Sequence, residues 1–423
     1  MDISKRVYVE EAKKKSKALV AGWVEKIKVL GNIAFITLRD NSGKLQIVAN
    51  KDFKGFKELS KITKESVIVA FGQVKKGKLK SGEKEMILKE LEVMNKADPV
   101  LPIEIFNETT GIDKRLDNRS LDIRNPKVKA IFKIQGVIIQ AFREFFYDKK
   151  FIEIQPPGII GVSTEGGTNL FKAKYFDKDV YLAQSPQLYK QFCAISWEKV
   201  FSVSPVWRAE KHNTSRHLNE ARQLDIEMTF EDQFGVMKYL EKVMEFIVKK
   251  VLKECKQEIK LLGLKLKVPK GKYLSYKETV ELLIKKGIKI KYGDDLEPEA
   301  EKKLSELFKD NIIFIHSWPN KLKPFYIWPL DKEISGGFDA IYNGVEISSG
   351  GQRVHDPEVL IKKLKEKGLK PASFKWYVDS FRYGAPIHSG WSIGLERVTM
   401  GICDLDNVRE ACLFPRDRDR VSP

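Results

Sequence analysis

Five short runs over the first hundred residues are apolar or alternate between apolar and polar residues. The runs begin at Ala18, Ile33, Lys44, Ser66 and Glu85, with turn formers between them. Such alternation is typical of half-buried strands. Between the third and fourth runs, apolar residues recur every third position in FKGFKELSKI, from Phe53 to Ile62, which predicts a helix. Five strands with a helix after the third predict an oligonucleotide-binding (OB) type β-barrel over residues 1–97.

The dipeptides Asp98-Pro99 and Leu101-Pro102, followed by a polar NETTG stretch, predict a linker over residues 98–124. Asn125-Pro126 then has the form of a helix start, with a capping Asn and Pro at the first helical position. An apolar stripe continues this helix to about Asp148, and a second stripe predicts a helix from Gly235 to Glu258.

Strand-like runs separated by short turns fill much of residues 125–423. They read FIEIQPP, DVYLAQS, KVFSVSPVW, ARQLDIEMTF, FYIWPL and GGFDAIYNGVEISS. Short connections favour antiparallel pairing, so this region is predicted to form a mainly antiparallel sheet with flanking helices. The predicted fold class is therefore α+β, with an N-terminal barrel followed by a larger domain.

Charge and cysteine content indicate the kind of partner and the cellular compartment. Lys and Arg number 76 against 58 Asp and Glu, a net charge of +18. This excess suits a polyanionic partner such as nucleic acid, although runs of lysine are also common on solvated surfaces. The four cysteines are far apart and form no zinc-binding spacing, which indicates free thiols in a reducing compartment. With no long apolar run, we expect a cytoplasmic protein that does not enter a membrane.

Neither a GxGxxG nor a GxxxxGK[ST] pattern occurs, so a bound nucleotide would be held by side chains. In VWRAEKHNTSRHLNE, we expect Arg208 and Glu210 to share one face of a strand that leaves Trp207, with Arg216 and His217 beyond a loop. Arginine forks bind phosphate in a bidentate manner, so this stretch is a candidate anion site.

Three further stretches carry candidate chemistry. GLER places Arg397 after a glycine, and TEGGTNLF is a glycine-containing loop that could close over a substrate. Asp339 and Glu346 lie on facing strands of a predicted hairpin that turns at Asn343-Gly344. Two carboxylates can hold Mg²⁺ through oxygen. Taken singly, each stretch also has an ordinary explanation as a surface ion pair, a solvated loop or a structural turn.

The order of these stretches resembles the three signature motifs of class II aminoacyl-tRNA synthetases, most closely the aspartate enzymes of the archaeal and eukaryotic type. FIEIQPP, VWRAE with Arg216-His217, and GLERV match the motifs. YLAQSPQLYKQ, GVEISSGGQRVHDPE, FRYGAPIHSG and FPRDRDRVSP extend the match over nearly the whole chain. The resemblance implies an anticodon-binding barrel, ATP as substrate, Mg²⁺, and a homodimer with Pro157 at its interface.

The resemblance also implies roles for individual residues. ATP would be bound by Arg208, Ala209, Glu210, Arg216, His217, Leu218, Glu346, Gly394, Leu395, Glu396 and Arg397, with Arg208, Arg397 and Glu346 as the catalytic set. Mg²⁺ would be bound by Glu346, Ser349 and Asp339. Aspartate would be bound by Glu165, Gln187, Lys190, Arg208, Ser349 and Arg353. The anticodon would contact Phe35, Gln46, Glu25 and Lys78, although Phe35 also fits a barrel-core position.

The expected reaction joins aspartate to ATP as aspartyl-adenylate, releases pyrophosphate, and then transfers aspartate to the 3′-end of tRNA(Asp). Lys190 beside Arg353 favours a carboxylate substrate over asparagine or lysine. The alternatives are an asparagine–tRNA ligase, an asparagine-forming ligase derived from a synthetase, which would usually lack the barrel, and a tRNA-binding regulator, which would be expected to lose Arg208, Glu346 or Arg397. Glu25 stands where relatives usually carry Trp or His, so charging of tRNA(Asn) as well is a further alternative.

Overall fold

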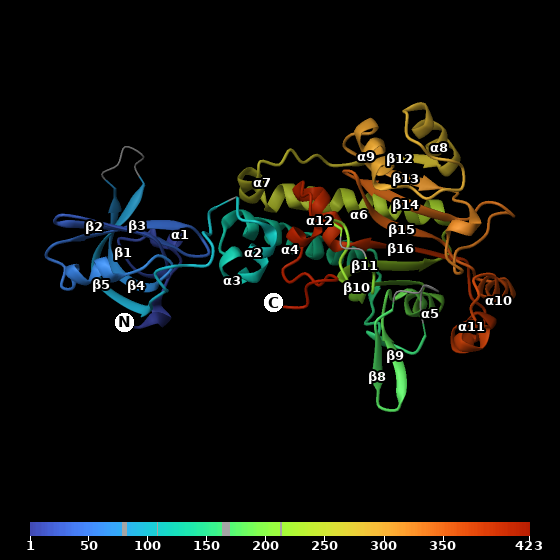
Figure 1. Ribbon diagram of the computed structural model, residues 1–423, viewed down its shortest axis with the longest axis horizontal. Helices are drawn as coiled ribbons and strands as arrows, with labels where there is room; N and C mark the ends of the chain where they lie inside the picture. Colours follow the sequence, from blue (N-terminus) through green and yellow to red (C-terminus); the bar gives the residue numbers. More distant parts are fainter. Residues whose placement is uncertain (78–82, 108, 163–169, 212–213) are drawn as a thin grey trace. The chain divides into compact units, whose positions relative to one another are not determined.

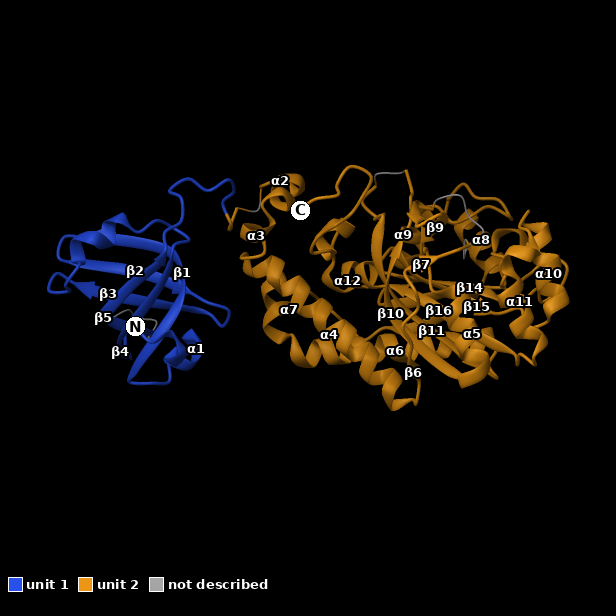
Figure 2. Cartoon of the chain, turned by 90° about the horizontal axis from the view of Figure 1, so that it is seen from below, with its two compact units in different colours: residues 1–104 blue, residues 105–423 orange. Residues whose placement is uncertain are grey.

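The computed structural model describes residues 1–77, 83–107, 109–162, 170–211 and 214–423. The chain divides into two compact units, Met1–Glu104 and Ile105–Pro423 (Figure 2). Among the described residues, no helix is both long and apolar enough to cross a membrane.

The first unit is a closed five-stranded barrel, as the alternating pattern predicts (Figure 1). The strands close in the order β1-β2-β3-β5-β4, and β3 pairs with β5 in parallel. Their bounds are β1 (Lys17–Leu30), β2 (Ile33–Arg39), β3 (Lys44–Asn50), β4 (Val67–Lys76) and β5 (Lys84–Asn95). Along β2, Ala34, Ile36 and Leu38 are fully buried in the core, whereas Phe35 between them is only half-buried. Phe35 therefore lies on the outer face of the barrel and not in its core.

The helix expected between the third and fourth strands is a 3-10 helix, η2 (Phe56–Lys61). Residues three apart are eclipsed in a 3-10 helix, which agrees with the three-residue spacing of the apolar positions. Leu59 and Ile62 are buried against the barrel core, with Phe53 and Phe56 packed beside them. A short α-helix, α1 (Val9–Ala12), precedes the barrel.

The second unit is built on an eight-stranded sheet of order β12-β13-β14-β15-β16-β11-β10-β6. Neighbouring strands are antiparallel except at β12–β13 and β10–β6, so the mainly antiparallel prediction is confirmed. The bounds are β6 (Ile152–Glu153), β10 (Lys199–Trp207), β11 (Glu220–Thr229), β12 (Lys270–Ser275), β13 (Asn311–His316), β14 (Gly337–Tyr342), β15 (Val345–Gln352) and β16 (His388–Gly394). A separate small sheet holds β7 (Ile159–Ile160), β8 (Lys172–Tyr175) and β9 (Lys178–Leu182).

Helices flank this sheet (Figure 1). Their bounds are α2 (Ile112–Asp117), α3 (Arg119–Asp122), α4 (Pro126–Asp148), α5 (Gln187–Trp197), α6 (Gln233–Glu254), α7 (Lys256–Leu262), α8 (Tyr276–Lys285), α9 (Pro298–Leu307), α10 (Pro357–Glu366), α11 (Lys375–Arg382) and α12 (Leu395–Cys403). The predicted cap of α4 is present, because the Asn125 side chain accepts a hydrogen bond from the Lys127 N–H.

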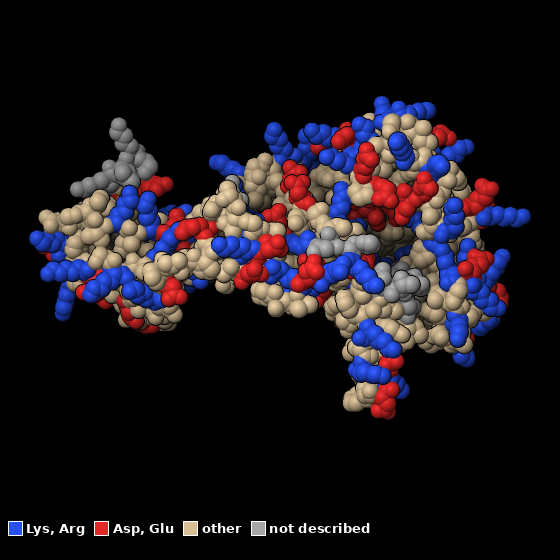
Figure 3. Space-filling view, viewed as in Figure 1, with Lys and Arg blue, Asp and Glu red and all other residues tan. Residues whose placement is uncertain are grey.

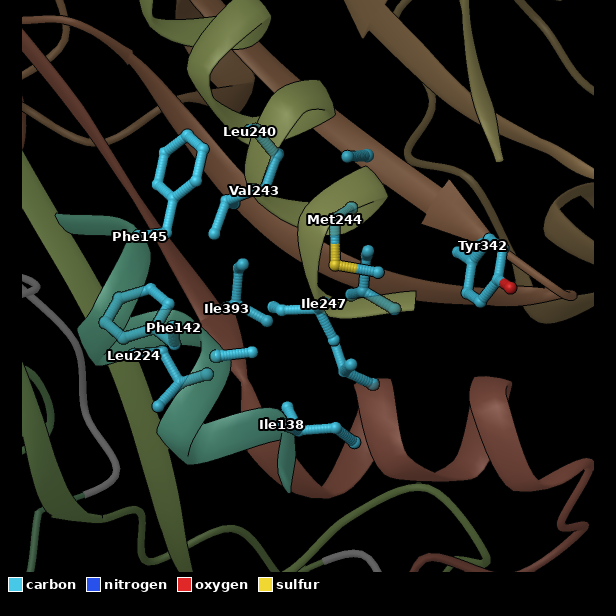
Figure 4. Packing of buried hydrophobic residues seen from close by; sticks show 14 of the residues in the cluster. Ile138, Phe142, Phe145, Leu224, Leu240, Val243, Met244, Ile247, Tyr342 and Ile393 are labelled. Atoms are coloured by element: carbon cyan, nitrogen blue, oxygen red, sulfur yellow. The ribbon is translucent and has the colours of Figure 1, made fainter. Parts of the chain in front are cut away.

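The main core lies between α4, α6 and one face of the sheet (Figure 4). Phe142 of α4 and Ile247 of α6 are fully buried there, together with Leu224 of β11 and Ile393 of β16. Side chains alternate along a strand, so the residues on either side of Leu224 in β11 face the opposite side of the sheet. That opposite side carries the candidate site.

Several sequence expectations differ from the structure. The helix expected over residues 235–258 is two helices, because Cys255 interrupts the helical backbone with φ −111° and ψ 34°. Residues 325–330, predicted as a strand, form only isolated bridges, such as Ile327 with Arg353. The expected linker over 98–124 includes helices α2 and α3, and from Ile105 onward it belongs to the second compact unit.

Candidate active site

A pocket of about 320 Å³ opens on the polar side of the sheet in the second unit. Figure 3 shows acidic and basic side chains gathered around a hollow in this unit. The predicted residues that line the pocket are Gln187, Arg208, Glu210, Arg216, His217, Leu218, Glu346, Ser349, Arg353, Gly394, Glu396 and Arg397. The sequence motifs, which are far apart along the chain, therefore converge on one cavity.

Other predicted residues lie outside the lining or outside the described part of the chain. Ala209 and Leu395 are neighbours of lining residues, and Lys190 and Asp339 lie behind the lining. Glu165 and Lys78 fall outside the described residues.

Arg208 and Glu210 follow strand β10 and are not part of it, because the strand ends at Trp207. The backbone N–H of Arg208 donates to the Asn219 carbonyl at 2.9 Å. The Asn219 side chain in turn donates to the carbonyls of Arg208, at 2.6 Å, and Glu210, at 3.1 Å. The hydrogen bonds of Asn219 thus hold the backbone of Arg208 and Glu210 in place beyond the end of β10. Arg208 is exposed in the pocket, and none of the described residues accepts a hydrogen bond from its guanidinium.

Arg216 and His217 are fixed on the far side of the loop. Thr214 Oγ1 lies 2.6 Å from His217 Nδ1, and His217 Nε2 is 3.8 Å from the Glu210 carboxylate. Arg216 donates from Nη1 to the Glu301 carboxylate at 2.9 Å and from Nη2 to the Gly344 carbonyl at 3.1 Å. Glu301 belongs to α9, which none of the recognised motifs includes.

Residues near the C-terminus also hold this loop. The Val408 N–H donates to the Ser215 carbonyl at 2.8 Å, and the Arg409 guanidinium donates to the Thr214 carbonyl at 3.2 Å. Arg409 is itself held by a 2.6 Å bond to Asp417 in the terminal FPRDRDRVSP stretch. The consecutive carbonyls of Thr214 and Ser215 are therefore bonded to residues near the C-terminus. These bonds lie next to the Thr214 hydroxyl that contacts His217.

Glu346 and Asp339 lie on paired strands, as the predicted hairpin requires. The hairpin turns at Asn343 and Gly344, with φ of 48° and 79°, which is the left-handed conformation that an Asn-Gly turn supplies. The pKa of Glu346 is raised to about 7, because the carboxyl is recessed in the protein and is repelled by Asp339. The side chain nevertheless remains 37% accessible to the pocket, and it lies 3.8 Å from Arg397 Nη1.

These two carboxylates are chemically suited to a divalent cation, whose positive charge would relieve the repulsion between them. Lys323 Nζ partly fills this role for Asp339 at 2.5 Å. Across the ranges that the structure describes, no three His, Cys, Asp or Glu side chains group closely enough to form a complete metal site. The protein therefore offers a partial oxygen ligand set.

The floor of the pocket contains a buried network of charges. Lys190 Nζ donates to Asp225 at 2.8 Å and to the Trp391 carbonyl at 3.1 Å, and it lies 3.7 Å from Glu227. Arg353 uses Nε and Nη2 to bind Glu227, at 2.8 Å and 3.2 Å. Burial raises the pKa of Asp225, against the opposing effect of Lys190. Lys190, which the resemblance assigns to aspartate binding, is thus an ion-paired ammonium beneath the pocket lining.

Asp225 and Glu227 are functional candidates that the sequence interpretation missed. Both lie on β11 and alternate with Leu224, Ile226 and Met228, which point into the hydrophobic core. Two acids at alternate positions of an otherwise apolar strand were the available signal in QLDIEMTF. Gly390 on β16 is required here, because a Cβ at that position would lie 2.1 Å from the Glu227 carboxylate.

A second buried network holds Gln187 at the pocket wall. Gln187 Nε2 donates to Gln191 Oε1 at 2.8 Å, and Gln191 Nε2 lies 2.9 Å from His388 Nε2. The Tyr377 hydroxyl also donates to Gln191 at 2.8 Å. Burial lowers the pKa of His388 to about 4, so the imidazole is neutral near pH 7.

Glu396 is more deeply buried than an exposed ATP contact would be. Its side chain lies at the start of α12 and is 5% exposed, and both carboxylate oxygens accept from the Arg222 N–H, at 3.2 and 3.1 Å. Burial raises its pKa to about 7.

On the barrel, Phe35 and Gln46 lie on adjacent strands and on the same outer face. Gln46 is paired in register with Thr37, two residues from Phe35, and its amide lies 3.5 Å from Glu85. Glu25 sits at a bulge in β1 and binds Lys44 at 2.6 Å. The geometry therefore brings three of the predicted anticodon residues onto neighbouring strands.

Comparisons with known proteins agree with this arrangement. Residues 111–418 match the family described as tRNA synthetases class II (D, K and N), and residues 18–94 match the OB-fold nucleic acid binding domain. The chain is 45% identical to the aspartate–tRNA(Asp) ligase of Pyrococcus horikoshii, covering 96% of this chain and 95% of that protein. It is 43% identical to the aspartate–tRNA(Asp/Asn) ligase of Methanopyrus kandleri, with the same coverage.

Solved structures give the same family. The asparaginyl-tRNA synthetase of Pyrococcus horikoshii, complexed with asparaginyl-adenylate, superposes with a TM-score of 0.95 at 35% identity and 99% coverage of both chains. The aspartyl tRNA synthetase of Entamoeba histolytica gives a TM-score of 0.90 at 33% identity, covering 99% of this chain and 93% of that one. The chain belongs to the class II tRNA synthetases of the D, K and N family and is an aminoacyl-tRNA synthetase with an N-terminal OB-fold domain.

Proposed function

We propose that this enzyme is an aspartate–tRNA ligase. It joins the α-carboxylate of L-aspartate to the α-phosphate of ATP, releases pyrophosphate, and transfers the aspartyl group to the 3′-end of tRNA(Asp). The observation that carries the amino-acid specificity is the buried pair of cations, Lys190 and Arg353, in the pocket floor.

Arg353 is the better placed of the two cations for direct contact with aspartate. It lines the pocket, and its bonds to Glu227 use Nε and Nη2, which leaves Nη1 for the side-chain carboxylate. Lys190 acts from behind: it pairs with Asp225 and lies 3.7 Å from Glu227, and so helps to fix the Glu227 carboxylate that holds Arg353. A buried guanidinium prefers an anionic oxygen to a neutral amide, which supports aspartate over asparagine.

Basic side chains lie at several points along the ATP side of the pocket. Arg208 contacts the α-phosphate, Arg216 and His217 contact the departing pyrophosphate, and Arg397 contacts the nucleotide from the opposite side. Glu346, Asp339 and Ser349 would hold Mg²⁺, and Mg²⁺ when bound neutralises phosphate charge and stabilises the charge that develops in the transition state.

A carboxylate that attacks phosphorus needs no general base. The main barriers are the mutual repulsion of two anions and the loss of orientational freedom. Arg208 addresses the first by compensating negative charge, and Arg353 addresses the second by anchoring the amino acid by its side chain.

The tRNA is recognised by the barrel, with Phe35 and Gln46 at the anticodon and positive charge along the same face. Lys26, Lys28 and Lys44 lie on the strand segments around Phe35 and Gln46. We further propose a homodimer through the segment around Pro157, supported by the exposed apolar residues Ile152 and Ile159 beside it.

Aspartate-dependent ATP–pyrophosphate exchange tests the amino-acid assignment. Wild-type enzyme should support exchange with L-aspartate and give much lower exchange with asparagine or lysine at equal concentration. Exchange with asparagine alone would establish the alternative, an asparagine–tRNA ligase, which the structural similarity to the Pyrococcus horikoshii asparaginyl enzyme makes the relevant competitor.

A further inference from the structure

We propose that Glu301 is a positioning residue that holds Arg216 ready for the pyrophosphate end of ATP. The inference rests on the proposed function, because it takes Arg216 as the contact to the β- and γ-phosphates. Glu301 lies on α9, 45 residues before Glu346 and outside the three motifs.

Glu301 connects two parts of the active site through one carboxylate oxygen. Its Oε2 accepts from Arg216 Nη1 at 2.9 Å and from the backbone N–H of Glu346 at 3.2 Å. The side chain is 12% exposed, and the partner Arg216 is 25% exposed. The bond is therefore shielded from water and stronger than a pair on the open surface.

Helix α9 is itself anchored to the same hairpin. The Gly344 N–H donates to Ser305 Oγ at 2.8 Å, one helical turn beyond Glu301. The Gly344 carbonyl is the second acceptor for Arg216, at 3.1 Å from Nη2. Arg216 is thus held between a helix and a turn that are bonded to each other.

This arrangement leaves Arg216 able to bind phosphate. The two observed bonds use one N–H of Nη1 and one of Nη2, and each of these nitrogens carries a second N–H. A guanidinium that is already fixed loses less side-chain entropy when the triphosphate binds. Glu301 would therefore improve the binding of ATP and pyrophosphate without touching either.

Substitution of Glu301 should change phosphate binding and spare the amino acid. In ATP–pyrophosphate exchange, Glu301→Ala should raise the KM for ATP and the KM for pyrophosphate by about tenfold or more, as expected for loss of a hydrogen bond to a charged group. The KM for aspartate should change by less than about twofold, because the Arg353 network is separate. Glu301→Gln should recover part of the loss, since its amide oxygen can still accept from Arg216.

Two further variants test whether Glu301 acts through Arg216. Glu299→Ala removes an exposed acid two residues before Glu301 on the same helix and should leave the KM for ATP within about twofold of wild type. In an Arg216→Ala background, adding Glu301→Ala should cause little further change, because a residue that acts through Arg216 has nothing left to position.

Three results would overturn the inference. These are an unchanged KM for ATP in Glu301→Ala, an equal rise in the KM for aspartate, and full additivity of the two substitutions in the double variant. The amino acid that supports exchange by wild-type enzyme is read in the same assay, so failure of the aspartate assignment is separate from failure of this proposal.

Discussion

The four buried charges of the pocket floor stabilise one another, and each depends on its partner. Lys190 and Asp225 are both 1% exposed, and Arg353 and Glu227 are similarly buried. Removing one member of a buried ion pair leaves an uncompensated charge, which is much more costly than losing a surface pair. The network therefore fixes the positive groups that we assign to aspartate.

Replacing Lys190 tests that assignment. Lys190→Met should raise the KM for aspartate by about 10- to 100-fold, because losing the charged hydrogen bond to Asp225, worth roughly 1.5–3 kcal/mol, loosens the Glu227–Arg353 pair that contacts aspartate. The KM for ATP should stay within about twofold, since Lys190 does not line the ATP side. Steady-state exchange kinetics measure both values, and Lys178→Met on the exposed β9 strand is the matched control. Unchanged aspartate kinetics would remove Lys190 from the recognition network.

The ionisation of Glu396 makes the free energy of unfolding depend on pH. Its pKa is raised from an ordinary value of 4.5 to about 7, so the folded state favours the protonated form. The associated stability is present below pH 4.5 and is lost as the pH rises through 7, a change of about 3 kcal/mol for a shift of this size. Glu396→Gln cannot ionise and its amide oxygen can still accept from the Arg222 N–H.

Without ligands, Glu396→Gln should therefore match wild type in stability near pH 4.5 and exceed it at pH 8. Calorimetric Tm values of both proteins at several pH values give the comparison. A Tm difference that does not change with pH would contradict a raised pKa in the folded protein.

At the residue scale, the motif arginines and acids could be predicted from the sequence, but their partners could not. The resemblance identified Arg216 and Glu346, and both line the pocket. Glu301 and Asp225 were missed because neither lies in a recognised motif, and their roles depend on contacts 85 and 35 residues away. Such contacts are set by tertiary packing, which local pattern does not specify.

Among the elements, those with strong local signals were predicted well. The Asn-Gly turn between β14 and β15, the capped helix α4 and the barrel strands all occur as expected. Strand β16 was missed, since its sequence HSGWSIG is rich in glycine and serine, which are poor strand formers. FYIWPL is apolar but does not form a strand. In both segments, the tertiary surroundings decide whether a strand forms, and the intrinsic strand preference of the residues does not.

Phe35, on the outward face of β2, is predicted to contact the tRNA. Phe35→Ala should raise the KM for tRNA by about 5- to 100-fold, since stacking of a base on an aromatic ring contributes about 1–3 kcal/mol. ATP–pyrophosphate exchange should not change, because that reaction needs no tRNA. Phe71→Ala, at a half-buried position on β4 of the same barrel, is the matched control. An equal effect of both variants would indicate loss of barrel stability and not of a specific contact.

The molecule consists of two separately packed units, to which we assign different roles. The barrel and the catalytic unit each have their own buried core. The net charge of +18 is consistent with a nucleic-acid partner, and the proposed reaction needs both the amino-acid pocket and the tRNA-binding barrel. The fold class and the two-unit organisation followed from patterning, whereas the side-chain networks required the structure.

Aminoacylation of a tRNA(Asp) transcript with labelled amino acid tests the central claim most directly. Wild-type enzyme with ATP and Mg²⁺ should attach labelled aspartate to tRNA(Asp) and should not attach labelled asparagine. A tRNA(Asn) transcript in a parallel reaction shows whether the enzyme accepts one tRNA or both. Attachment of asparagine in place of aspartate would contradict the account.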